Sequence, residues 1–121
     1  MTEFAGRIPR VSAYLQDIRE SGRAIAAYLH GVTEAEFRQN PMRQDAGIRR
    51  LEIIGEAAGR IMSADRQFLE HFPDLPLREA YDMRNFVSHG YDAVDLAIVW
   101  DTASKDVPAL TEAVEALLAA F

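Results

Sequence analysis

The chain has 121 residues, 49% of them apolar and 26% charged, a composition typical of one folded domain over residues 1–121. It contains no cysteine, which excludes disulfides, cysteine-bound metals and thiol nucleophiles and fits a reducing compartment. Its apolar runs are far shorter than the roughly 20 residues of a membrane span, and its first ten residues lack the apolar segment of a secretory signal. We therefore expect a globular cytoplasmic protein.

The net charge of −6 argues against nucleic-acid binding, but the charges are unevenly distributed. Residues 1–60 carry nine arginines against eight acidic residues, whereas residues 61–121 carry three arginines and one lysine against eleven acidic residues. A polyanion is therefore expected to approach the first half. Arg43 and Arg50, seven residues apart, form a stripe that either follows an RNA backbone or is an ordinary solvated flank.

The first half of the chain has the period of helices. Apolar residues at three- and four-residue steps predict a helix over about residues 9–30, and Gly31 would end it. Thr33 and Glu36 have the spacing of a capping box, which predicts a short helix to Phe37. Asn40 and Pro41 then look like the N-cap and first residue of a long helix to about residue 62, in which Gly47 and Gly55 would let a neighbouring helix approach closely.

The second half continues in the same way. We expect a short helix over residues 63–72, a turn over residues 73–76, and a helix from Pro76 to about His89 that ends at Gly90. Asp92 is a candidate N-cap for the last helix, which Pro108 should kink or split near Asp106 because proline lacks a backbone donor. These elements predict an all-α antiparallel bundle of four to five main helices.

One short segment concentrates polar side chains of several kinds. Residues 84–91 contain Arg84, Asn85, Ser88, His89 and Tyr91. On a regular helix, the side chains of Arg84 and His89 would diverge by roughly 140°, whereas Arg84 and Ser88 share a face. Arg84 and His89 can therefore meet only if the helix end unwinds or if a second copy of the chain supplies one of them. A histidine at a helix end beside an arginine can also be purely structural.

This segment reads Arg84-Asn-Phe-Val-Ser-His89-Gly-Tyr91, an arginine, four residues, a histidine, one residue and a tyrosine. In that pattern the chain resembles the HepT-type toxins of the HEPN superfamily, small all-helical ribonucleases paired with nucleotidyltransferase antitoxins. Residues 44–58 resemble the second-helix signature of that family. Residues 94–100, with Val107 and Pro108, resemble its closing helix.

The resemblance implies the toxin of a type VII toxin–antitoxin system, an RNA endonuclease that needs neither a metal nor a cofactor. Arg84 and His89 of both subunits of a homodimer would line one cleft, with Asn85 and Ser88 in supporting roles. His89 suits removal of the 2′-hydroxyl proton near neutral pH, and Arg84 suits the charged phosphate. The resemblance further implies that an MntA-like nucleotidyltransferase antitoxin neutralises the toxin by transferring AMP to Tyr91.

A further expectation concerns the association of two copies of the chain. Ile53 lies roughly opposite the apolar face of its helix, and one chain cannot easily bury both faces, so we expect a homodimer through the face that carries Ile53 and the motif helix.

The alternative function is a non-catalytic helical module that binds a nucleotide or presents itself to a nucleotidyltransferase. In that case Arg84 would hold a nucleotide phosphate and His89 would be a structural hydrogen-bonding group.

Overall fold

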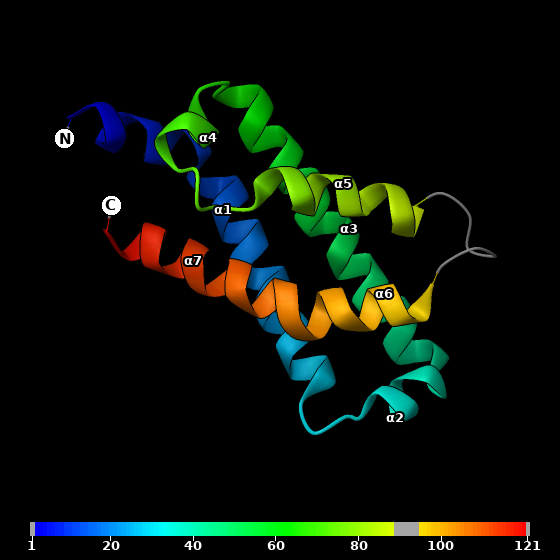
Figure 1. The fold of residues 1–121 in the computed structure, drawn as a ribbon. Helices are drawn as coiled ribbons and strands as arrows, with labels where there is room; N and C mark the ends of the chain where they lie inside the picture. The colour runs from blue at the N-terminus through cyan, green and yellow to red at the C-terminus, as the bar shows by residue number, and fades with distance from the viewer. Residues whose placement is uncertain (1, 89–94, 121) are drawn as a thin grey trace.

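The computed structural model describes residues 2–88 and 95–120, and of residues 2–7, 85, 86 and 88 it describes the backbone alone. The predicted all-α fold is confirmed, since the described residues contain no strand (Figure 1). In chain order the elements are α1 (Thr2–Leu29), α2 (Glu34–Arg38), α3 (Pro41–Ala64), α4 (Phe68–His71), α5 (Leu77–Ser88), α6 (Leu96–Asp101), the π-helical segment η2 (Thr102–Asp106) and α7 (Val107–Ala120).

Four long helical segments build the bundle. α1 packs against α3 and α7, α3 also packs against α5, and α6, η2 and α7 follow one another as a nearly continuous rod (Figure 1). The core lies between these segments, and its largest fully buried side chains include Phe37, Phe68, Leu15, Ile18 and Ile61. The order of packing leaves α5 at one side of the bundle, held mainly by α3.

The first helix is longer than the sequence predicts. α1 begins at Thr2 and continues through Pro9, where we expected the helix to start. Ile8 and Val11, at 3% and 0% exposure, continue the buried stripe past the proline on both sides. This burial is the physical reason that packing outweighs the missing backbone hydrogen bond of Pro9.

The caps of the next two helices are confirmed. The Thr33 Oγ1 atom accepts the backbone N–H of Glu36 at 3.2 Å, while the Glu36 carboxylate accepts the backbone N–H of Thr33 at 3.0 Å. The hydrogen bond from the Thr33 backbone, followed by the one from its side chain, lowers the pKa of Glu36 below its ordinary value. Asn40 caps α3 by accepting the Arg43 N–H at 3.1 Å, and Pro41 follows at the first helical position.

The region between α3 and α5 differs from the prediction. A short helix is present within residues 63–72, but its predicted bounds are wrong, because α3 continues to Ala64 and α4 covers Phe68–His71 alone. The cause is Asp65, whose N–H bonds back to Ile61 at 3.0 Å and whose carboxylate accepts the Gln67 N–H at 3.2 Å, making a turn between the two helices. Pro76 directly precedes α5 and is not its first residue.

The closing segment changes its helical geometry near Asp106, where the sequence predicts a kink or split. Pro108 lacks the N–H that a regular helix needs, and the π-helical segment η2 comes directly before α7. The N-cap of α6 is Asp95, which accepts the Ala97 N–H at 2.9 Å. The predicted stop at Gly90 and the predicted N-cap Asp92 lie outside the described residues.

Candidate active site

Arg84 lies in the last turn and a half of α5, where this helix crosses α3. Leu77 and Val87 of the same helix are 0% and 1% exposed and hold it on the bundle, whereas the side chain of Arg84 is exposed. Among the described side chains, no carboxylate forms an ion pair with Arg84. A guanidinium group can bind a phosphate through two parallel hydrogen bonds, so an exposed arginine at this place is a candidate anion contact.

Two glycines of α3 bring α5 close at this point. A Cβ atom on Gly55 would lie 3.1 Å from both the Ala80 carbonyl oxygen and the Arg84 Cβ atom, and one on Gly59 would lie 2.7 Å from the ring of Tyr81. Any larger residue would push α5 or the Tyr81 ring away from α3. The expected close approach is thus confirmed at Gly55, whereas a Cβ atom on Gly47 would meet nothing within 4 Å.

Beside this contact the surface forms a polar groove of about 510 Å³, which we call the arginine groove. Its charged and aromatic lining residues are Arg60, Arg66, Arg78, Arg84, Glu56 and Tyr81. The described lining thus holds four arginines and one glutamate, and the Glu56 carboxylate pairs with Arg60 at 3.1 Å. The groove carries a local excess of positive charge on a chain whose net charge is −6.

The other predicted motif residues are only partly described. The backbone of Asn85 and Ser88 belongs to α5, which places Ser88 one helical turn after Arg84, but their side chains are not described. His89 and Tyr91 lie outside the described residues. The catalytic pair and the modified tyrosine therefore stay predictions.

The two arginines predicted to follow RNA both contact Tyr28 at the end of α1. The Arg43 Nε atom donates to the Tyr28 carbonyl oxygen at 2.8 Å, and the Arg50 Nε atom donates to the Tyr28 hydroxyl at 3.4 Å. Both side chains are half-buried. These bonds join α1 to α3, and RNA binding by Arg43 and Arg50 stays a prediction.

Sequence reasoning missed Arg60, Arg66 and Arg78 as members of a site. They come from α3, from the turn after it and from α5, so no short motif connects them. The available signal was the close approach that Gly55 predicts, but the sequence does not identify α5 as the helix that approaches.

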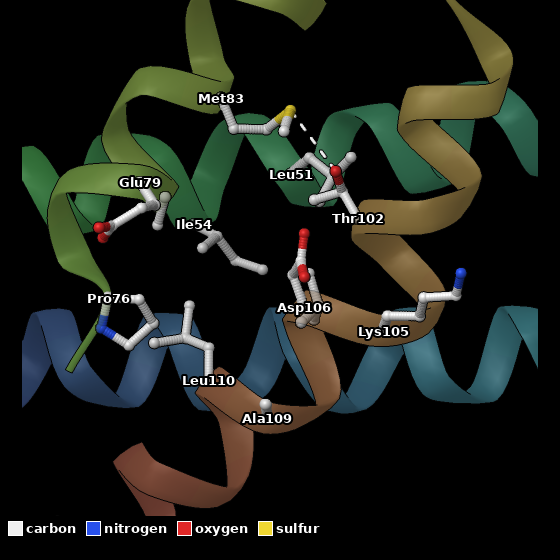
Figure 2. A pocket seen from close by; sticks show the side chains of 12 residues that line it. Leu51, Ile54, Pro76, Glu79, Met83, Thr102, Lys105, Asp106, Ala109 and Leu110 are labelled. Atoms are coloured by element: carbon white, nitrogen blue, oxygen red, sulfur yellow. Dashed lines mark hydrogen bonds between the residues drawn. The ribbon is translucent and has the colours of Figure 1, made fainter. Parts of the chain in front are cut away.

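A second cavity, of about 320 Å³, lies on the other side of α5 (Figure 2). Leu51, Ile54 and Leu110 give it mainly aliphatic walls, and the Thr102 hydroxyl faces the Met83 sulfur at 3.8 Å. Among the described residues of its lining, Lys105 alone is basic, and it pairs with Asp101 at 3.4 Å. The described part of this lining therefore offers few cations to a phosphate chain.

Two features are absent from the described residues. Within residues 2–88 and 95–120, no three acidic or histidine side chains gather as metal ligands would. None of the helices in this part of the chain combines the length and the apolar character needed to cross a bilayer.

Residues 18–117 match the family model described as ribonuclease HepT-like. A protein of Methanocaldococcus jannaschii named putative RNase is 37% identical over 105 residues, which cover 87% of this chain and 94% of that protein. A protein of Thermococcus cleftensis named probable ribonuclease HepT is 36% identical over 97 residues, covering 80% and 86% of the two chains. No solved structure is similar enough to count as a match.

Proposed function

Because the chain belongs to the HepT-like ribonuclease family, we propose that it is a metal-independent RNA endonuclease and the toxin of a type VII toxin–antitoxin system. The observation that carries the proposal is the placement of Arg84, which is exposed, free of a carboxylate partner among the described side chains, and followed at the family spacing by His89 and Tyr91. The related proteins are named as RNases, which supports RNA as the substrate.

The proposed reaction is an internal transesterification. His89 removes the proton from a ribose 2′-hydroxyl, the 2′ oxygen attacks the adjacent phosphorus, and the bond to the 5′ oxygen of the next nucleotide breaks as that oxygen gains a proton. Arg84 contacts two phosphate oxygens and stabilises the charge that grows on them. The products are a 2′,3′-cyclic phosphate and a 5′-hydroxyl, and Asn85 and Ser88 support the position of the phosphate or of His89.

The proposal includes a homodimer, a nucleotidyltransferase partner and a cytoplasmic location. Arg84 and His89 diverge along a regular helix, and a second copy that contributes to the same cleft would bring them together. The partner, an MntA-like antitoxin, would transfer AMP to Tyr91 and so block the site.

Cleavage of RNA by the purified chain tests the proposed reaction. We expect His89→Ala and Arg84→Ala each to slow cleavage by about 10²–10⁴-fold while helix content and dimer mass stay unchanged. The control variant Arg49→Ala, which removes an exposed arginine outside the groove, should cleave RNA at the wild-type rate. End analysis of the wild-type products should find 2′,3′-cyclic phosphates, and excess EDTA should leave the rate unchanged. A residual rate above about a tenth of wild type in His89→Ala would rule out His89 as the base. A wild-type chain that cuts no RNA would favour the non-catalytic module instead.

A further inference from the structure

We propose that the arginine groove binds single-stranded RNA next to the phosphate that is cleaved, a role that rests on the proposed ribonuclease function. The groove includes Arg84 and extends away from it over α3 and the first turn of α5, through Arg60, Arg66 and Arg78. Since Arg84 is the proposed contact of the cleaved phosphate, the other three arginines lie where the neighbouring phosphates of the same strand would pass.

The local charge favours a polyanion at this surface. Arg66, Arg78 and Arg84 are exposed, and among the described side chains none of the three is paired with a carboxylate. The rest of the molecule is acidic, with a net charge of −6 for the whole chain. Because charges are screened over about 10 Å at 0.1 M salt, a nearby cluster of guanidinium groups outweighs the more distant acidic residues. RNA would thus be attracted to the groove despite the net negative charge of the chain.

The groove also contains a surface for an unpaired base. Tyr81 lies among the four arginines, half-buried, with its ring over Gly59 of α3. A packed aromatic ring beside phosphate-binding cations is the combination that single-stranded nucleic acids bind, through base stacking and backbone contacts. A duplex keeps its bases stacked on one another and would use the arginines alone. The geometry therefore favours a single strand.

Equilibrium binding of a single-stranded RNA with 2′-O-methyl riboses tests the groove separately from cleavage, because this RNA lacks the attacking hydroxyl. We expect Arg66→Ala/Arg78→Ala to bind more weakly and to lower the slope of log affinity against log salt by about 1.4, since each lost phosphate contact with a single strand accounts for roughly 0.7. Arg66→Lys/Arg78→Lys should keep most of the slope. Arg10→Ala/Arg49→Ala, which removes two exposed arginines outside the groove, should keep the wild-type slope.

The outcomes separate RNA binding by the groove from the ribonuclease function. If the groove variant and the Arg10/Arg49 control lose the same amount of salt slope, then the effect is one of general charge and RNA binding by the groove is overturned. It is also overturned if neither variant loses slope. Duplex RNA that competes as well as single strands would overturn the assignment to a single strand. A wild-type chain that binds through the groove but cuts no unmodified RNA would refute the nuclease and leave the groove standing. Circular dichroism on every variant confirms that it is folded.

Discussion

At the scale of single residues, the proposed switch is the hydroxyl of Tyr91. One AMP esterified to this phenol adds about one negative charge two residues from His89, and a close pair with the Arg84 guanidinium would be worth on the order of 1–4 kcal/mol, depending on exposure to solvent. RNA phosphate would then compete for an occupied cation. We expect Tyr91→Phe to keep cleaving RNA, because a phenol is not needed as base or cation, and to escape neutralisation by a nucleotidyltransferase given ATP.

Intact-mass spectrometry checks the switch directly. The wild-type chain should gain mass in steps of one AMP, and Tyr91→Phe should gain none. Tyr81→Phe, at a half-buried tyrosine of α5, tests whether another phenol is used, and it should be modified like the wild type. If Tyr91→Phe is modified or neutralised as readily as the wild type, then the switch is at another residue.

Individual side chains were the hardest part to predict from the sequence. The sequence predicts that Arg84 shares a face with Ser88 and does not predict how exposed it is. Its spacing from Arg50 places Arg43 on a stripe open to RNA or solvent, yet its Nε atom bonds the Tyr28 carbonyl at 2.8 Å. Carbonyl groups in the last turn of a helix lack helical partners, so a neighbouring arginine readily takes them. Which arginine does so depends on how α1 and α3 pack, and no pattern within one helix contains that information.

At the scale of helices, the small residues at crossings determine how closely the elements pack. A Cβ atom on Gly22 of α1 would overlap the side chain of Thr111, which is 8% exposed and donates to the Val107 carbonyl at 2.7 Å in α7. A Cβ atom on Gly47 of α3 would meet nothing within 4 Å. The same substitution should therefore have opposite effects at the two positions.

We expect Gly22→Ala to destabilise the fold, because an overlap in a packed core typically costs about 1–3 kcal/mol, more than the roughly 0.5–1 kcal/mol that alanine gains in a helix. Gly47→Ala should gain that helix contribution without an overlap. Chemical denaturation of both variants and the wild type measures the two free energies of unfolding. Equal changes of the same sign would mean that α1 and α7 do not meet at Gly22.

Element boundaries were predictable where a local signal fixes them. The capping box at Thr33 and the Asn40-Pro41 start need three or four neighbouring residues, and both are confirmed. The sequence does not predict the end of α3, because the turn at Asp65 depends on hydrogen bonds to Ile61 before it and Gln67 after it. It does not predict the start of α1, because burial of Ile8 keeps Pro9 inside a helix. Local chemistry thus predicted the caps, whereas the boundaries set by tertiary packing needed the structure.

At the scale of the whole molecule, the distribution of charge in space differs from its distribution along the chain. The first half of the sequence holds the basic excess, yet three of the four arginines in the groove, Arg66, Arg78 and Arg84, come from the acidic second half. α5 returns to pack on α3 and carries two of these arginines to Arg60. A net charge counted along the sequence therefore does not locate the surface for a polyanion.

The last prediction concerns the assembly of two copies. Ile53 is half-buried on α3 beside Tyr14 and Asp17 of α1, at a shallow cavity of about 220 Å³, so part of its side chain stays available to a second chain. We expect Ile53→Glu to yield monomers by light scattering and to lose RNA cleavage, because a carboxylate at an apolar contact must give up its hydration.

The control is Met42→Glu, the same kind of change at a residue of α3 that is 83% exposed, and this variant should stay dimeric and active. A wild-type chain that is monomeric at micromolar concentration and still cleaves RNA would contradict the composite cleft, and Arg84 and His89 would then have to meet within one chain.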